Sequence, residues 1–250
     1  MPPTPPSPPP IQWPLPKFNI RIEDLAHPGA VLFLDNIKPL DALRSAVLAS
    51  FNLLYARPVY APTNVESILL VLRPMDGVAY TFGSAAEKEI HFSLDHIVNC
   101  ASRAQDEIMG VLVHEVVHCY QYNANGSAPG GLIEGIADFV RLRTNLCPPH
   151  WRRAPGPKDR WDAGYQTTAY FLDWIEERSG RGAIRALNKA LKDEEYDEKI
   201  FVVIGAEPVR DLWRRFKAEL GVEDREEEEE EKEGGGGGEA LVRSYNPVYI

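Results

Sequence analysis

The stretch HEVVHCYQYNANGSAPGGLIEGIAD, residues 114–138, decides how this chain is interpreted. It opens with His114 and His118, four residues apart, and it closes with Glu134 and Asp138, which are also four apart. Residues at positions i and i+4 of an α-helix project from one face, about one turn apart. The stretch therefore predicts two helices that each present a polar pair, joined by a loop rich in glycine and asparagine.

The first pair lies in HEVVH, which matches the HExxH pattern of zinc metalloproteases. Two imidazoles at this spacing can bind one zinc ion, each at roughly 2.0–2.1 Å. Glu115 projects about a quarter-turn away from them, where it can contact a water molecule beside the metal and act as a general base. A catalytic zinc site needs three protein ligands and one open position, so a third ligand must come from elsewhere in the chain.

The third ligand is not where the longer HExxHxxGxxH pattern would place it. That pattern needs a glycine and a histidine after HExxH, and Gln121 and Ala124 occupy those two positions. The next candidates are the acidic pair on the following helix. Glu134 is the predicted third ligand, and Asp138 is predicted to accept the second ring N–H of a ligating histidine. The reverse assignment, with Asp138 on the metal, stays open.

A lone HExxH also occurs by chance, and the competing interpretation is an amphipathic helix with two solvent-facing histidines. The sequence context favours the metal site. Glu115, Glu134 and Asp138 are all expected around one cleft, and burying three carboxylates without a cation would cost free energy. The sequence therefore predicts a Zn²⁺ site formed by His114, His118 and Glu134.

The apolar patterns on either side of this stretch predict a mixed sheet first and helices afterwards. Such an order is typical of an α+β domain. Ser102 is the expected N-cap of the helix that carries HEVVH. Strands are expected at 30–37, 67–72, 78–82 and 89–97, and helices at 39–55, 102–122, 132–145, 162–178, 182–192 and 208–220.

The two ends of the chain differ from its middle in composition. Residues 1–18 form a proline-rich tail that is expected to be extended and could serve as a ligand for an SH3- or WW-type partner. Residues 223–250 form an acidic and glycine-rich tail that is expected to be flexible. The predicted folded domain is the segment between them, 19–222.

Charge and apolar content exclude several classes of function. The formal net charge is −10, and without the six glutamates 226–231 about −4 remains, which is no basic footprint for nucleic acid or for an anionic membrane. No apolar run approaches the ~20 residues of a membrane span. The N-terminus lacks the charged start and apolar stretch of a secretory signal, so an intracellular protein is expected. Its three cysteines, Cys100, Cys119 and Cys147, are expected to be reduced.

The segment HEVVHCYQYNANGSAPGGLIEGIADFVRLR resembles the plant basic secretory protein family, also described as peptidases of plants and bacteria. GVAYTFG, EIHFS and RWDAGYQTTAYFLDWIE resemble the same family, so the likeness covers about residues 30–220. It implies a single zincin-like domain of the gluzincin type and a secreted, often defence-associated role. By position it implies metal binding by His114, His118 and Glu134 and a base role for Glu115. The chain departs from its namesakes because it is acidic and shows no signal peptide.

These observations predict a zinc metallopeptidase in which Glu115 moves the proton. Tyr165 is the candidate donor to the oxyanion, and a half-buried core tyrosine is the alternative interpretation. The strand 89–97 is expected to offer an exposed edge that pairs with an extended peptide substrate. His91 and His96 would point to opposite faces of that strand, so both are expected to be structural.

Two further points stay open on the sequence. Arg141, two turns beyond Glu134, is expected either to orient carboxylates or to lie on the surface. A function of a different class is a non-catalytic binding or scaffold protein, which would keep the metal-binding fold and recruit partners through its polyproline and acidic tails. The intact pattern of His114, Glu115, His118 and Glu134 favours the enzyme.

Overall fold

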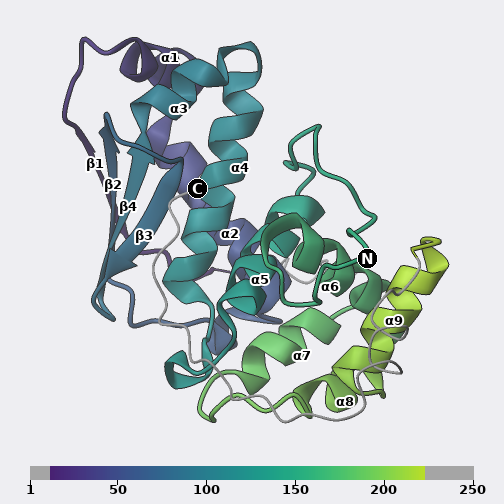
Figure 1. Cartoon of the computed structure of the whole chain (residues 1–250). Helices are drawn as coiled ribbons and strands as arrows, with labels where there is room; N and C mark the ends of the chain where they lie inside the picture. Colours follow the sequence, from purple (N-terminus) through teal and green to yellow (C-terminus); the bar gives the residue numbers. More distant parts are fainter. Residues whose placement is uncertain (1–11, 223–250) are drawn as a thin grey trace, which may run out of the picture.

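A computed structural model describes residues 12–222 of the chain (Figure 1). The predicted acidic tail and all but residues 12–18 of the proline-rich tail lie outside the described residues. The packed region starts before the predicted boundary at residue 19. The ring of Trp13 lies 5.3 Å from the ring of Phe51, and the first strand begins at Lys17.

The described chain is an α+β domain, as predicted, with a small mixed sheet and several helices. Its strands are β1 (Lys17–Ile22), β2 (Ser67–Arg73), β3 (Ala79–Gly83) and β4 (Glu87–Ser93). Its α-helices are α1 (Pro28–Asn36), α2 (Pro39–Leu54), α3 (Leu94–Asn99), α4 (Ala104–Tyr120), α5 (Gly130–Arg143), α6 (Tyr165–Ser179), α7 (Ala183–Ala190), α8 (Ile200–Gly205) and α9 (Val209–Glu219).

The sheet has the strand order β1-β2-β4-β3. β1, β2 and β4 run parallel, and β3 pairs antiparallel with β4. The apolar run of β2 is buried because it lies between two neighbours, and Leu70 is paired there with Ile90 of β4. β3 lies at one edge of the sheet, next to β4. It also packs against α4, and three of its residues line the site described below.

α4 runs between the sheet and the helical C-terminal half of the domain (Figure 1). It packs against α2 on one side and α5 on another, and almost all of its side chains are buried. α5 in turn packs closely against α6, because Gly135 has no side chain. A Cβ at this position would lie 2.2 Å from the methyl group of Thr168. The fold thereby fixes α4 and α5 side by side, the two helices that carry the polar pairs.

The strand predicted at 30–37 is wrong, since these residues belong to α1. His27 caps this helix by accepting a hydrogen bond from the Gly29 N–H, and Pro28 suits its first turn. The burial pattern is helical, because Phe33 is buried while Val31 is exposed. A short apolar run does not distinguish a strand from a buried helix by periodicity, which is why the sequence misled.

Other elements also differ from the predictions. β4 ends at Ser93, whose hydroxyl caps α3, so the segment 89–97 is only partly a strand. β4 lies inside the sheet, and the prediction that it offers an exposed edge is wrong. Ser102 does not cap α4, because Arg103 precedes the helix and makes no side-chain cap. β1 and α8 were not predicted from the sequence.

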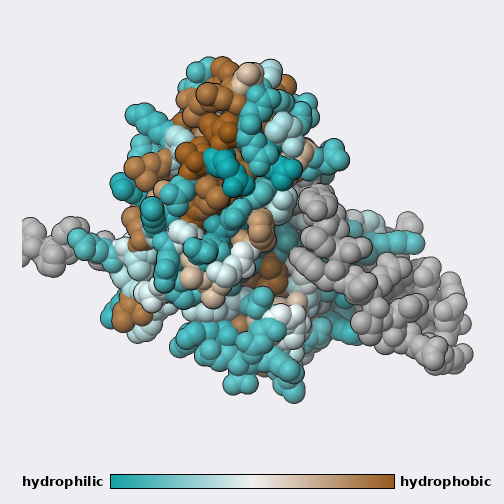
Figure 2. Space-filling view, turned by 90° about the vertical axis from the view of Figure 1, so that its left-hand side faces the viewer, coloured by the Kyte–Doolittle hydropathy of each residue, from teal (hydrophilic) through white to brown (hydrophobic). Residues whose placement is uncertain are grey.

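Apolar side chains reach the surface on the sheet side of the molecule (Figure 2). Exposed ones include Val31 and Leu34 of α1, Ile20 of β1 and Phe82 of β3. No helix between residues 12 and 222 combines the length and the apolar composition that a bilayer crossing requires. Figure 2 shows the apolar residues of this face gathered over its upper part.

Candidate metal centre

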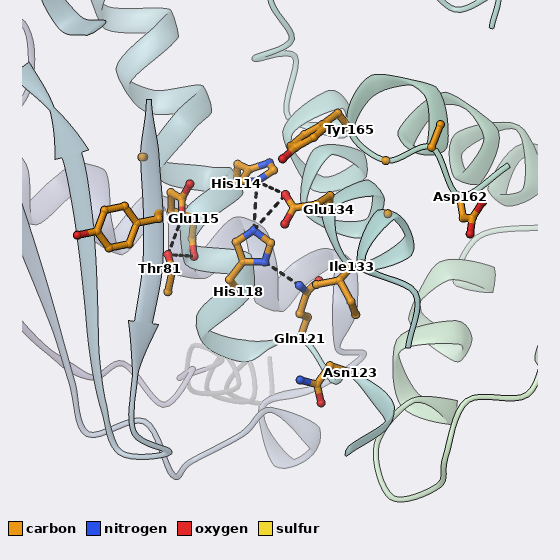
Figure 3. A pocket seen from close by; sticks show the side chains of 16 residues that line it. Thr81, His114, Glu115, His118, Gln121, Asn123, Ile133, Glu134, Asp162 and Tyr165 are labelled. Atoms are coloured by element: carbon orange, nitrogen blue, oxygen red, sulfur yellow. Dashed lines mark hydrogen bonds and ion pairs between the residues drawn. The ribbon is translucent and has the colours of Figure 1, made fainter. Parts of the chain in front are cut away.

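α4 brings its two histidines to the wall of a cleft (Figure 3). The ring centroids of His114 and His118 are 4.8 Å apart with the planes at 80°, and the two Nε2 atoms are 3.1 Å apart. His114 is only 3% exposed, while His118 is partly open to the cleft. The competing interpretation of two solvent-facing histidines on an amphipathic helix is therefore wrong.

α5 brings Glu134 to the same point. Its Oε2 lies 3.1 Å from Nε2 of His114 and 3.6 Å from Nε2 of His118. Three ligands held tetrahedrally at roughly 2.0–2.1 Å from one ion are about 3.3 Å from each other. The three observed separations bracket that value, so this donor set fits a zinc ion without rearrangement of the helices.

Asp138 occupies the position predicted for it, behind the first histidine. Its Oδ1 is 2.6 Å from Nδ1 of His114, and it is buried on the same face of α5 as Glu134. A proton on Nδ1 is therefore held by Asp138, which leaves the lone pair of Nε2 directed at the point where Glu134 and His118 meet. Of the two assignments that the sequence left open, this geometry favours Glu134 as the ligand.

Gln121 contacts the other histidine in the corresponding way. Its side-chain nitrogen is 2.7 Å from Nδ1 of His118, and its buried Oε1 has no hydrogen-bond partner. With the amide rotated by 180°, Oε1 accepts the proton of Nδ1, and both groups are satisfied. His118 then also presents an unprotonated Nε2. Gln121 lines the cleft, and its role in orienting a histidine was not predicted from the sequence.

Carboxylates dominate the electrostatics of this cluster. Burial disfavours the charged form of His114, but Asp138 and Glu134 outweigh burial and raise the pKa of His114 to about 10. Burial also acts against ionised Glu134, yet hydrogen bonds from His114 and His118 hold the pKa of Glu134 well below its usual range. The site thus stabilises positive charge at His114, next to the point where a divalent cation would be held.

Glu115 lies beside the two histidines on α4 and is almost completely buried. Its carboxylate Oε2 is 2.6 Å from the hydroxyl of Thr81, and its backbone oxygen is 3.0 Å from the same hydroxyl. Thr81 belongs to β3, so the edge strand restrains the predicted base (Figure 3). The sequence interpretation missed Thr81. The signal available was a single hydroxyl in the strand segment AYTFG.

Tyr165 begins α6 and reaches the site from the opposite side to β3. Its ring is stacked on His114 at 6.3 Å and 16°, and Figure 3 shows its hydroxyl end directed toward that histidine. Its backbone has φ of +44°, a left-handed conformation that is strained for a tyrosine. The preceding segment is held close to α5, since a Cβ on Gly131 would lie 1.9 Å from the Asp162 carbonyl oxygen.

These groups line one cavity of about 520 Å³. α4 contributes the histidines and Glu115, α5 contributes Glu134, and β3 and the start of α6 contribute Thr81 and Tyr165 (Figure 3). All six predicted site residues lie in or directly behind this cavity, with Asp138 as the one behind. The cleft therefore combines a candidate cation site, a carboxylate and a phenol within one small volume.

Arg141 lies away from this cleft, in a second polar cluster. It is buried and donates to Glu107 of α4 at 3.1 Å, so it orients a carboxylate, as one of the two sequence alternatives had it. Arg103 and His96 contact the same carboxylate. His91 has other partners, Tyr80 and Glu89. The two histidines 91 and 96 thus have separate partners, in keeping with the structural roles predicted for them.

Comparison with protein families agrees with the resemblance noted above. The profile of the family described as peptidase of plants and bacteria matches residues 15–216, which is most of the chain. Comparison with curated proteins and comparison with solved structures each gave no match. The extent of the family match decides the assignment: the chain belongs to the family of peptidases of plants and bacteria.

Proposed function

We propose that the chain is a zinc-dependent peptidase with a zincin-like fold of the gluzincin type, in which His114, His118 and Glu134 hold the ion. The observation that carries this proposal is the convergence of three ligand atoms at separations of 3.1, 3.1 and 3.6 Å on the wall of an open cleft. Membership in a peptidase family supports hydrolysis of a peptide bond as the reaction.

A zinc ion bound there would polarise the substrate carbonyl and lower the pKa of a water molecule to about 7. Glu115 accepts a proton from the attacking water and delivers it to the leaving amine. Its carboxylate is suited to this because Thr81 holds Oε2 and limits its rotation. Tyr165 donates its hydroxyl proton in a hydrogen bond to the developing oxyanion, from the side of the cleft opposite to β3.

The substrate would bind along the edge strand β3, not along β4. Among the described residues β3 has a pairing partner on only one side, and Ala79, Tyr80 and Thr81 line the cleft. An extended peptide can add to such an edge through main-chain hydrogen bonds. This placement would put the scissile bond between Thr81 of the edge strand and the two histidines.

Replacement of the base tests the proposal. Glu115→Gln keeps the shape of the side chain but removes the proton acceptor, so kcat on a casein-like substrate should fall by roughly 10²- to 10⁴-fold. One equivalent of zinc should remain bound, because Glu115 is not a ligand. Glu87→Gln makes the same change at an exposed position of β4 and should leave kcat unchanged.

Two outcomes would contradict the proposal. Undiminished hydrolysis by Glu115→Gln with zinc bound would exclude Glu115 as the base. A wild-type protein that binds zinc but cleaves no bond in a broad peptide library would instead favour the non-catalytic binding protein.

A further inference from the structure

A second cavity, of about 230 Å³, opens next to the metal-site cleft. Three residues, His114, Glu115 and Tyr165, line both cavities. The second cavity therefore borders the point where the proposed reaction takes place. The second one extends from there toward α3 and the loop that follows α5, where it reaches His96 and Trp151.

α4 arranges the two cavities end to end. His114, Glu115 and His118 of α4 line the metal-site cleft, together with Gln121 just after the helix. Glu107, Val111, His114 and Glu115 of the same helix line the second cavity. Val111 and His118 are seven residues apart, which is about 10 Å along the helix. A residue bound next to the scissile bond can therefore place its side chain in the second cavity while the bond itself stays at the histidines.

The free surface of this cavity is mostly apolar. Val78, Val111, Pro148 and Trp151 supply the apolar part of its walls, next to polar side chains that include His150. Trp151 is held in place on two sides. Its ring packs edge-on against Tyr170 at 6.3 Å, and the guanidinium of Arg141 lies 5.4 Å from its centre. The aromatic wall is therefore fixed before any substrate binds.

The buried charged groups of the lining are already paired with one another. Glu107 is hydrogen-bonded to His96 and Arg141, and Arg141 also donates to the Leu146 carbonyl oxygen. Asp138 is bonded to His114. An ionic substrate side chain would have to displace one of these pairs. An apolar side chain would displace only water.

We infer that this cavity binds a large apolar side chain, aliphatic or aromatic, of one of the two residues that flank the scissile peptide bond. The inference rests on the proposed peptidase function and assigns its substrate preference. One methylene more or less in an apolar pocket changes kcat/KM by about 10- to 200-fold, so the preference should be strong.

The test is digestion of a mixed peptide library with the zinc-loaded full-length protein, with the cleaved bonds identified by mass spectrometry. Wild type should cut beside Leu, Ile, Met or Phe at least about tenfold faster than beside Gly or Ala at the same position. Val111→Phe fills the cavity from α4 and should reverse this preference in favour of small side chains, with zinc content unchanged. Val203→Phe, at an exposed site on α8, is the matched control and should keep the wild-type preference.

Trp151→Ala gives a second test that does not place a larger side chain on α4. It removes the aromatic wall and should lower the preference for large over small side chains by about tenfold. A wild-type enzyme that cleaves peptides without an apolar preference would overturn the inference and leave the peptidase proposal standing. An apolar preference that survives both Val111→Phe and Trp151→Ala would overturn it as well. A wild-type protein that binds zinc and cleaves no peptide would instead contradict the proposed peptidase function.

Discussion

α4 contributes to two clusters of histidine and carboxylate that are alike in composition and differ in the groups around them. In one, His114, His118 and Glu134 bring three ligand atoms together. In the other, His96, Cys100 and Glu107 do the same, with Nε2 of the histidine 3.2 Å from a Glu107 oxygen and 3.5 Å from the cysteine sulfur. By distances alone, both could hold a metal ion.

The charges of the neighbouring groups separate the two clusters. Glu107 is paired with Arg103 and Arg141, so two guanidinium groups face one carboxylate, and a divalent cation would be repelled. Around the first cluster, Glu115, Glu134 and Asp138 supply three carboxylates, and the ion pairs of Glu134 among the described residues are with the two histidines. The two arginines therefore convert a possible ligand set into a structural ion-pair network.

The largest expected effect is on metal content, and it follows directly from this comparison. His118→Ala removes one of three ligands and should reduce bound zinc from one equivalent to none after dialysis. His96→Ala removes a histidine from the arginine-containing cluster and should leave one equivalent bound. Elemental analysis of both purified variants checks the prediction. Loss of zinc in His96→Ala together with retention in His118→Ala would exchange the roles of the two clusters.

The next effect concerns the residue that orients His118. Gln121→Ala should weaken zinc binding by about 10- to 100-fold, because the Nδ1 proton of His118 loses its acceptor. Gln121→Glu keeps an acceptor and should retain most of the affinity. Gln105→Ala, an exposed change at the start of α4, is the control. Competition with a chelator measures the zinc affinity of all three variants. An unchanged affinity in Gln121→Ala would show that Gln121 does not orient His118.

A smaller effect is expected at the edge strand. Thr81→Val keeps the shape of the side chain but removes the hydrogen bond to Glu115, so kcat should fall by about tenfold, as expected for one hydrogen bond to a charged group. Zinc content and KM should stay near the wild-type values, and Thr81→Ser should restore most of kcat. Equal activity of the valine and serine variants would show that Thr81 has only a packing role.

Part of the metal site could be predicted from the sequence. The spacing of His114 with His118 and of Glu134 with Asp138 was enough to predict two helices with polar faces, and the glycines between them predicted the loop. Which acid meets Nε2 and which meets Nδ1 depends on the rotation of α5 against α4. That rotation is set by tertiary packing, including the contact of Gly135 with Thr168.

Contacts between distant segments could not be predicted from the sequence for the same reason. The hydrogen bond between Thr81 and Glu115 joins residues 34 apart, and that between Glu107 and Arg141 also spans 34. The periodic pattern of apolar residues carries no information about such distant pairs. The helix α1 was mistaken for a strand because its apolar run is short, and its start signal, the His27 cap before Pro28, is an unusual one.

The second cluster is expected to act as a network that stabilises the fold. Burial disfavours ionised Glu107, but the hydrogen bond to His96 and the two arginines outweigh it and lower the pKa of Glu107 to about 2. A lowered carboxyl pKa adds stability that is fully present above about pH 4.5, the usual value, and is lost as the pH falls toward 2. Denaturant unfolding should show this loss in wild type.

Glu107→Gln removes the titrating group. It should cost about 1–3 kcal/mol of unfolding free energy at pH 7 and flatten the pH dependence between pH 4.5 and 2, with zinc content unchanged. An equally steep acid loss in this variant would show that other carboxyl groups are responsible.

The most direct test of the central claim is X-ray absorption at the zinc edge of the purified protein. Two imidazoles and Glu134 predict only nitrogen and oxygen neighbours, at roughly 2.0–2.2 Å. A sulfur neighbour at about 2.3 Å would contradict a site made of His114, His118 and Glu134. The other group of possible ligands among the described residues contains a sulfur, that of Cys100.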